Sequence, residues 1–95
     1  MSDTKYSIYM IEHKSRDIRY IGITGVSIAR RMSAHQCRMR TGSTTSRLYT
    51  ALRKYGWDNF DVTVIDSART LKQAAGLEQL YIPLYNGNLN TVHAT

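Results

Sequence analysis

Tyr9 and Tyr20 are the residues whose type and spacing first suggest acid–base chemistry. Each lies in a segment rich in aromatic and β-branched residues, which is typical of a β-strand. A hairpin symmetric about the Lys14–Ser15 bond pairs Tyr9 with Tyr20 and Ser7 with Gly22. Directly opposed residues share one face, so this register predicts two phenols side by side, next to a patch floored by a serine and a glycine. An ordinary cross-strand aromatic pair is the alternative interpretation.

Arg31 and His35 lie four residues apart in a predicted helix, so they share one face of it. Ile28 and Met32 lie on or beside that face, which places the pair next to the core. An arginine there suits the charge of a phosphate, and a histidine can accept or relay a proton near neutral pH. A hydrogen-bonded structural histidine is the alternative interpretation of His35.

Glu78 is the candidate metal ligand. It lies in the last predicted helix, flanked at helical spacing by apolar and small residues such as Leu71, Ala74 and Tyr81. A carboxylate in such surroundings is costly unless a cation is paired with it. That cation is either an arginine from the middle of the chain or a metal ion, and one carboxylate completed by water and substrate phosphate suits Mg²⁺. Asn90, in a glycine-containing tail, has ordinary turn chemistry as its alternative.

The distribution of charge indicates a polyanionic partner. The chain carries 13 Lys and Arg against 7 Asp and Glu, a formal net charge of +6. No acidic residue lies between Asp17 and Asp58, and most cations of this stretch are arginine, which suits bidentate contact with phosphate. We expect DNA or RNA as the partner and no membrane, with a solvated basic face as the alternative. The residues predicted to bind nucleic acid are Lys14, Arg30, Arg38, Arg40, Arg47, Arg53 and Lys54.

Several classes of protein are excluded by motifs that the sequence lacks. It contains no P-loop, no glycine-rich dinucleotide turn, no Gly-x-Ser-x-Gly elbow and no His-Glu-x-x-His motif. Cys37 is the single cysteine, so neither an internal disulfide nor a cysteine zinc site can form. No apolar run approaches the ~18 residues of a spanning helix, and the N-terminus lacks the apolar region of a signal peptide. We therefore expect a cytoplasmic protein.

The 95 residues are enough for one small domain, which we expect to span residues 1–95. Hydrophobic periodicity, serine N-caps, glycine stops and one proline predict its strands and helices. The predicted strands cover residues 6–12, 18–24 and 60–64, and the predicted helices run from Ser27 through Met39 to a stop at Gly42, from Ser46 to Gly56, and from about Thr70 to Pro83. This order, β-β-α-α-β-α, predicts a small α/β domain with a three-stranded β-sheet flanked by helices.

The same residues, taken in order, resemble the GIY-YIG nuclease domain. Ser7-Ile8-Tyr9 and Tyr20-Ile21-Gly22 resemble the two tripeptides that name the family. The resemblance continues along almost the whole chain with Arg31-x-x-x-His35, Lys54-Tyr55-Gly56-x-x-x-Phe60, Glu78-Gln79-x-Tyr81-Ile82 and Asn90. Ordered elements at compatible spacings are much more specific than one tripeptide.

The resemblance implies a Mg²⁺-dependent phosphodiesterase that cuts DNA, with Mn²⁺ able to substitute. Glu78 would hold one metal ion at the scissile phosphate and the departing 3′ oxygen. Tyr9 or Tyr20 would assist the attacking water as general base, which requires nearby cations to lower a phenol pKa from about 10. The other implied roles are charge balance in the transition state by Arg31, tuning or relay of the proton by His35, and orientation of the site by Asn90.

The chain departs from the family pattern at two places. Ser7 replaces the first glycine of the family's name, and Ser43 and Thr44 stand where some homing members carry a second histidine. No zinc finger or helix-turn-helix follows, so we expect specificity to come from a homodimer, a separate partner protein or the shape of the substrate. Two alternatives to the nuclease stay open, a non-catalytic nucleic-acid-binding module of the same fold and a protein-interaction or inhibitor domain.

Overall fold

The computed structural model describes residues 5–42 and 46–90 and confirms the predicted fold class and order of elements. The strands are β1 (Tyr6–His13), β2 (Arg19–Thr24) and β3 (Phe60–Ala68), and the helices are α1 (Ile28–Thr41), α2 (Arg47–Tyr55), the short 3₁₀ helix η1 (Trp57–Asn59) and α3 (Leu71–Leu84). Within these ranges no helix combines the length and apolar character needed to cross a membrane.

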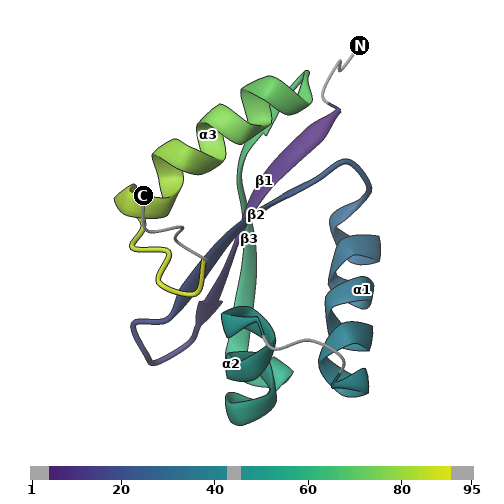
Figure 1. The fold of residues 1–95 in the computed structure, drawn as a ribbon, viewed down its shortest axis with the longest axis vertical. Helices are drawn as coiled ribbons and strands as arrows, with labels where there is room; N and C mark the ends of the chain where they lie inside the picture. The colour runs from purple at the N-terminus through teal and green to yellow at the C-terminus, as the bar shows by residue number, and fades with distance from the viewer. Residues whose placement is uncertain (1–4, 43–45, 91–95) are drawn as a thin grey trace.

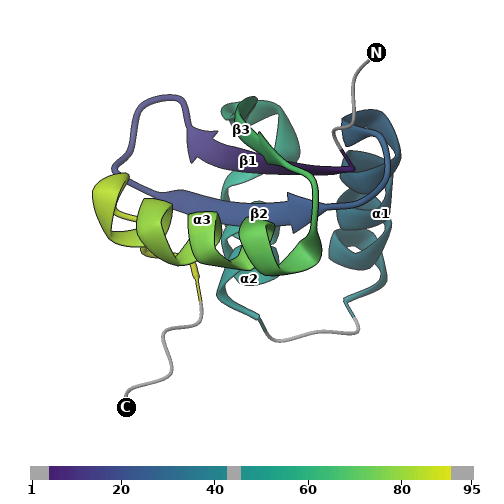
Figure 2. The same ribbon diagram turned by 90° about the horizontal axis from the view of Figure 1, so that it is seen from above.

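The three strands form one antiparallel sheet in the order β2-β1-β3, with helices on both of its faces (Figure 1). Side chains alternate between the two faces along each strand. Tyr9 and Ile11 point into a core with α1 and α2, whereas Ile8 and Ile21 belong to a second core with α3. Figure 2 shows α3 lying alongside β2. Contacts of α3 reach all three strands, so α3 packs across this face of the sheet.

The ends of the helices lie close to the predicted capping residues. The hydroxyls of Ser27 and Ser46 accept hydrogen bonds from amides in the first turns of α1 and α2, which otherwise lack partners. Gly42 ends α1 with a φ of 66°, a left-handed conformation that favours glycine. Pro83 lies just before the end of α3, so the predicted stop is confirmed to within one residue.

The register predicted for the β1–β2 hairpin is wrong. Tyr9 pairs with Gly22 rather than with Tyr20, and Ser7 pairs with Thr24. The shift of two residues keeps Tyr9 and Tyr20 on the same face, since side chains alternate with a period of two. The predicted patch floored by Ser7 and Gly22 is also wrong, because the Tyr9 ring lies over Gly22.

The His13 side chain is the physical reason for the shifted register. Its Nδ1 accepts hydrogen bonds from the backbone amides of Ser15 and Arg16, both at 3.1 Å. The His13 amide in turn donates to the carbonyl of Ile18 at 3.0 Å. A side chain that orders the loop in this way moves the centre of the hairpin one bond along the chain, which residue alternation alone does not reveal.

Candidate active site

Gly22 on β2 provides the space that the Tyr9 side chain occupies. A Cβ at position 22 would lie 2.4 Å from Tyr9 Cζ and 2.5 Å from Tyr9 Oη. The Tyr20 ring lies beside the Tyr9 ring, with centroids 6.3 Å apart and planes tilted by 48°. The two phenols are therefore neighbours as predicted, through a diagonal rather than a direct cross-strand pairing.

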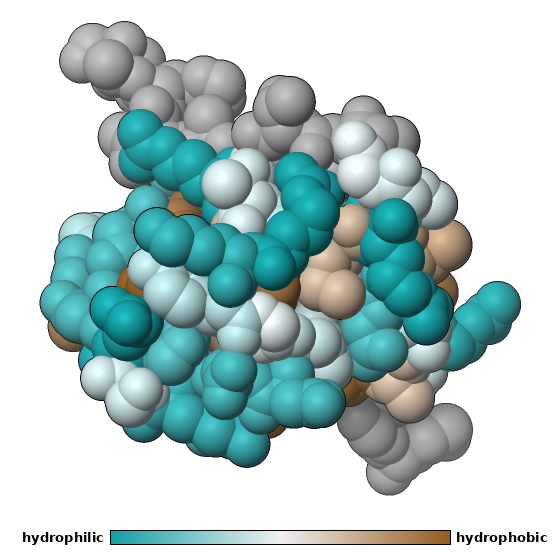
Figure 3. All heavy atoms as spheres, turned by 90° about the horizontal axis from the view of Figure 1, so that it is seen from below, coloured by the Kyte–Doolittle hydropathy of each residue, from teal (hydrophilic) through white to brown (hydrophobic). Residues whose placement is uncertain are grey.

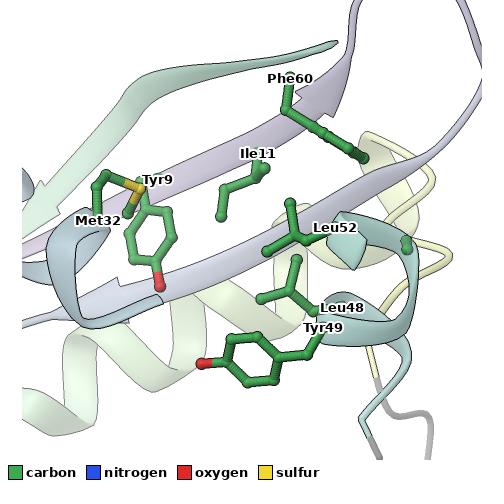
Figure 4. Packing of buried hydrophobic residues seen from close by; sticks show 8 residues of the cluster. Tyr9, Ile11, Met32, Leu48, Tyr49, Leu52 and Phe60 are labelled. Carbon is green, nitrogen blue, oxygen red and sulfur yellow. The ribbon is translucent and has the colours of Figure 1, made fainter. Parts of the chain in front are cut away.

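The Tyr9 hydroxyl begins a buried chain of hydrogen bonds. Tyr9 Oη lies 2.7 Å from His35 Nε2, and His35 Nδ1 lies 2.7 Å from Oη of Tyr49 on α2. Arg31 Nε donates a longer hydrogen bond of 3.4 Å to Tyr9 Oη. Figure 4 shows the hydroxyls of Tyr9 and Tyr49 directed into the same region of the core. Arg31 and His35, predicted to share one helix face, thus contact the same phenol.

Burial, more than charge, determines the pKa of each phenol. Burial raises the pKa of Tyr9, and the hydrogen bond and charge of Arg31 lower it by less. The pKa of Tyr20 is also raised, chiefly by burial and then by the negative charges of ionised Tyr9 and Glu78. The charge of Arg31 alone therefore leaves the pKa of both phenols above the ordinary value.

His35 is neutral at pH 7. Burial, followed by the positive charges of Arg31 and Arg38, lowers the pKa of His35 from 6.5 to about 4. A neutral imidazole has one N–H donor and one acceptor nitrogen, and each of the two nitrogens faces a tyrosine hydroxyl. His35 can therefore receive one more proton.

Tyr20 differs from Tyr9 in access and in hydrogen bonding. The side chain of Tyr9 is 0% exposed, whereas Tyr20 is only half-buried. Among residues 5–42 and 46–90, no protein group forms a hydrogen bond with the Tyr20 hydroxyl. The Tyr20 hydroxyl is thus available to water or to a bound phosphate.

Glu78 is a half-buried carboxylate on α3. Burial raises its pKa, and its charge in turn raises the pKa of both Tyr9 and Tyr20. Within the described ranges neither an ion pair nor a hydrogen bond engages Glu78, so the expected alternative of a partner arginine has no support there.

The carboxylate of Glu78 fits a magnesium ion that receives its other ligands from elsewhere. No cluster of three His, Cys, Asp or Glu side chains suited to a metal occurs in the described part of the chain. Mg²⁺ is commonly bound through one or two carboxylates, several waters and substrate phosphates. A single carboxylate with no partner in residues 5–42 and 46–90 provides this kind of ligand, whereas it would not suit a structural zinc ion.

Asn90 binds the backbone of β2 from the free edge of the strand. Its Oδ1 accepts from the Ile21 amide at 2.8 Å, and its Nδ2 donates to the Ile21 carbonyl at 2.7 Å. Gly87 makes this approach close, because a Cβ there would lie 2.7 Å from Asn90 Oδ1. Both polar ends of the side chain are thus engaged, which fits a role in orienting β2 rather than contact with substrate.

The seven predicted nucleic-acid ligands are all exposed, but they do not share one face. Lys14 lies in the hairpin loop, and the others lie on α1 and α2. Arg38 follows Arg31 by seven residues and so shares its face of α1, whereas Arg40 follows by nine and points to the opposite side. Of these residues, Arg38 is therefore the one on α1 that extends the site.

Arg47 and Lys54, seven residues apart on α2, line a hollow of about 360 Å³. Its other lining residues are Ile18, Thr50, Ala51, Tyr55, Asn88 and Leu89. The molecule seen from below the view of Figure 1 is mainly hydrophilic, with smaller apolar areas between the polar side chains (Figure 3). This end of the domain therefore presents charge beside apolar surface.

Tyr49 is the residue of this cluster that the sequence did not reveal. It lies beside the apolar face of α2 and is buried. A buried phenol needs a hydrogen-bond partner, and this requirement is the one feature of the sequence that could have indicated Tyr49. Its partner, His35, lies on another helix, and helical spacing carries no information about such a contact. Ser43 and Thr44, at the place of a family histidine, lie outside the described residues.

Comparisons with known proteins identify the family. A family model described as the GIY-YIG catalytic domain matches residues 5–90. This match covers most of the chain, so the protein belongs to the GIY-YIG family and is an endonuclease domain. Members of this family typically use a divalent metal ion. No curated protein matches the chain.

Two solved structures share the fold. The catalytic domain of the homing endonuclease I-TevI has a TM-score of 0.76 at 19% identity, covering 90% of this chain and 94% of that one. A glutamate-to-alanine variant of the same catalytic domain, described as an intron endonuclease, has a TM-score of 0.78 at 21% identity, covering 96% and 97%. At these identities the likeness establishes the fold.

Proposed function

We propose that the protein is a metal-dependent endonuclease that hydrolyses DNA phosphodiester bonds. The observation that carries this proposal is the position of the Tyr9 hydroxyl between a proton acceptor on His35 and a cation on Arg31. Hydrolysis of a phosphodiester requires a base for the attacking water and positive charge at the phosphate. The carboxylate of Glu78, which has no partner among the described residues, adds a ligand for a metal ion.

In this proposal Tyr9 is the general base, because its own proton has an acceptor. A neutral phenol takes a proton from water only if it releases its own proton at the same time. His35 Nε2, 2.7 Å from Tyr9 Oη, can receive that proton, whereas the Tyr20 hydroxyl has no such acceptor in the described ranges. Tyr20, the more exposed phenol, would donate a hydrogen bond to a phosphate oxygen.

Arg31 would control access to Tyr9. Its 3.4 Å hydrogen bond to Tyr9 Oη is long compared with an ordinary one of about 2.9 Å, so a phosphate would draw the guanidinium away and uncover the oxygen. The positive charges of Arg31 and Arg38 are two of the causes that lower the pKa of His35. A phosphate bound by both arginines would therefore raise the pKa of His35 and make it a better proton acceptor.

Glu78 would hold Mg²⁺, and we expect Mn²⁺ to replace it. When bound, the ion would neutralise charge on the phosphate and stabilise the departing 3′ oxygen. The chain contributes the carboxylate, which burial leaves with a raised pKa and which no described side chain neutralises. Binding of a cation would relieve that unfavourable burial of charge.

The test is single-turnover nicking of supercoiled plasmid by the wild type and by tyrosine-to-phenylalanine variants. We expect Tyr9→Phe to lose about 10²- to 10⁴-fold in rate, the usual contribution of a general base. Tyr20→Phe should lose less, and Tyr85→Phe, an exposed control at the end of α3, should match the wild type. Salt-dependent DNA binding by a wild type that never nicks would favour the non-catalytic module, and wild-type rates in Tyr9→Phe would refute the role of Tyr9.

A further inference from the structure

We propose that Tyr49 is a positioning residue for the nuclease reaction: it holds His35 in the tautomer that leaves Nε2 free to take the proton of Tyr9. This inference rests on the proposed function for its consequence in catalysis. The arrangement of protons that it specifies is a property of the free protein and is tested separately.

The hydrogen bond between Arg31 and Tyr9 has only one possible direction. A guanidinium donates and never accepts, so Arg31 Nε–H points at Tyr9 Oη, 3.4 Å away. The Tyr9 oxygen thus already accepts one hydrogen bond. Its own proton needs an acceptor, because Tyr9 is 0% exposed and cannot donate to water.

His35 Nε2 is the acceptor available to that proton in the described part of the chain. It lies 2.7 Å from Tyr9 Oη, a short distance for such a bond. If Nε2 instead carried the proton, Tyr9 Oη would face two donors and its own buried proton would have no partner. An unmade hydrogen bond of this kind is costly, so Nε2 is unprotonated and the proton of the neutral imidazole is on Nδ1.

Tyr49 completes the arrangement on the other side of the ring. With the proton on Nδ1, His35 donates to Tyr49 Oη over 2.7 Å. Tyr49 is 6% exposed and Tyr9 is 0% exposed, so of these two tyrosines only Tyr49 has surface open to solvent. The Tyr49 hydroxyl would also stabilise the imidazolium that forms when His35 is protonated, since it keeps accepting from Nδ1–H.

The reaction step that follows balances its protons. As the water oxygen forms a bond to phosphorus, its proton passes to Tyr9 Oη and the Tyr9 proton passes to His35 Nε2. The bond from phosphorus to the 3′ oxygen breaks, its electron pair leaves on that oxygen, and solvent supplies the proton for it. His35, protonated on both nitrogens, then releases its Nε2 proton back to Tyr9 and from there to water.

The groups that face His35 come from four elements. Tyr9 and Tyr20 lie on β1 and β2, Arg31 and Arg38 lie on its own helix α1, and Tyr49 lies on α2. Within the described ranges none of these groups is a carboxylate. The residue that His35 Nδ1 contacts is therefore a tyrosine and not an aspartate or glutamate.

The test uses the intact chain and the variants Tyr49→Phe and Tyr55→Phe. Both remove one hydroxyl from α2 and keep the ring, but Tyr55 contacts the His13 ring instead of His35. Nitrogen NMR of the wild type should report His35 protonated on Nδ1. Tyr49→Phe should change the tautomer population, lower the nicking rate at least about tenfold and shift its pH profile, whereas Tyr55→Phe should do none of these.

The outcomes separate this inference from the proposed function. A wild-type His35 protonated on Nε2, or a Tyr49→Phe variant with unchanged tautomer, rate and pH profile, would overturn the role of Tyr49. A wild type that never nicks DNA but shows the Nδ1 tautomer, lost in Tyr49→Phe, would refute the nuclease while leaving the positioning of His35 by Tyr49 in place. The wild-type spectrum alone decides which nitrogen of His35 is protonated, so that part of the test does not depend on the folding of any variant.

Discussion

Replacing Gly22 by alanine should disturb the site through a single methyl group. The added Cβ would lie 2.4 Å from Tyr9 Cζ, 2.5 Å from Tyr9 Oη and 2.9 Å from Tyr20 Cε2, all closer than real Cβ contacts. The effect would be steric, because Gly22 is not among the glycines with positive φ. The Tyr9 ring cannot yield freely, since its hydroxyl is held by His35 at 2.7 Å.

Two effects set the size of the expected loss in stability. Overpacking a core in this way costs about 1–3 kcal/mol, and loss of the hydrogen bond between Tyr9 and His35 adds about 1 kcal/mol. We therefore expect Gly22→Ala to lower the free energy of unfolding by roughly 2–4 kcal/mol. For a domain of this size each kcal/mol shifts Tm by about 4–8 °C, so Tm should fall by roughly 10 °C or more.

Gly76→Ala is the matched control for the same chemical change. Gly76 lies inside α3, and a Cβ there meets no atom within 4 Å. Alanine in a helix interior is favoured over glycine by about 0.5–1 kcal/mol, so this variant should be more stable than the wild type. Thermal and urea unfolding followed by circular dichroism measure both. A Gly22→Ala variant as stable as the wild type, with an undisturbed Tyr9 hydroxyl, would refute the close packing at Gly22.

Three further predictions concern the edge of β2, the buried histidine and the basic face. Asn90→Ala should lower the free energy of unfolding by about 2–4 kcal/mol in urea titrations, because both backbone groups of Ile21 lose partners; an unchanged value would contradict this role. Since the folded pKa of His35, about 4, lies below its unfolded value of 6.5, stability should fall as pH falls from about 6.5 to about 4, by up to about 3 kcal/mol, and His35→Gln should remove this part of the fall. Arg38→Gln should reduce the salt slope of DNA binding by about 1, while Arg40→Gln, on the opposite side of α1, should leave it unchanged.

Local signals in the sequence predict the fold of this chain well. Serine caps, glycine stops and hydrophobic spacing concern residues within a few positions of one another, and Ser27, Gly42 and Ser46 lie where these rules require. The alternation of side chains also places Tyr9 and Tyr20 on one face, because a register shift of two residues leaves every side chain on the same face of the sheet.

The register itself depends on a side chain and could not be obtained from alternation. His13 orders the hairpin loop through Nδ1, and its partners are loop amides that carry no sequence signature. Without that contact, the alternation of side chains favours a symmetric hairpin. The resulting pairing of Tyr9 with Gly22 explains the need for glycine at that position better than the predicted open patch does.

The contacts that connect the site also lie beyond local patterns. His35 and Tyr49 are 14 residues apart on different helices, and Asn90 and Ile21 are 69 residues apart. The sequence could nominate Glu78 as a costly carboxylate but left a partner arginine and a metal ion as equal explanations. In the structure the ion pairs of the described residues engage Arg19 with Glu12 and Asp17, so an arginine partner of Glu78 is not found among them.

The measurement that tests the central claim most directly is plasmid nicking by the wild type and by Glu78→Gln, each with Mg²⁺ and with EDTA. Asp61→Asn, which removes an exposed carboxylate from β3, is the matched control. We predict nicking by the wild type and Asp61→Asn with Mg²⁺, and none with EDTA or in a folded Glu78→Gln variant that still binds DNA. Nicking that persists in EDTA, or in Glu78→Gln at the wild-type rate, would contradict a reaction that depends on a metal ion held by Glu78.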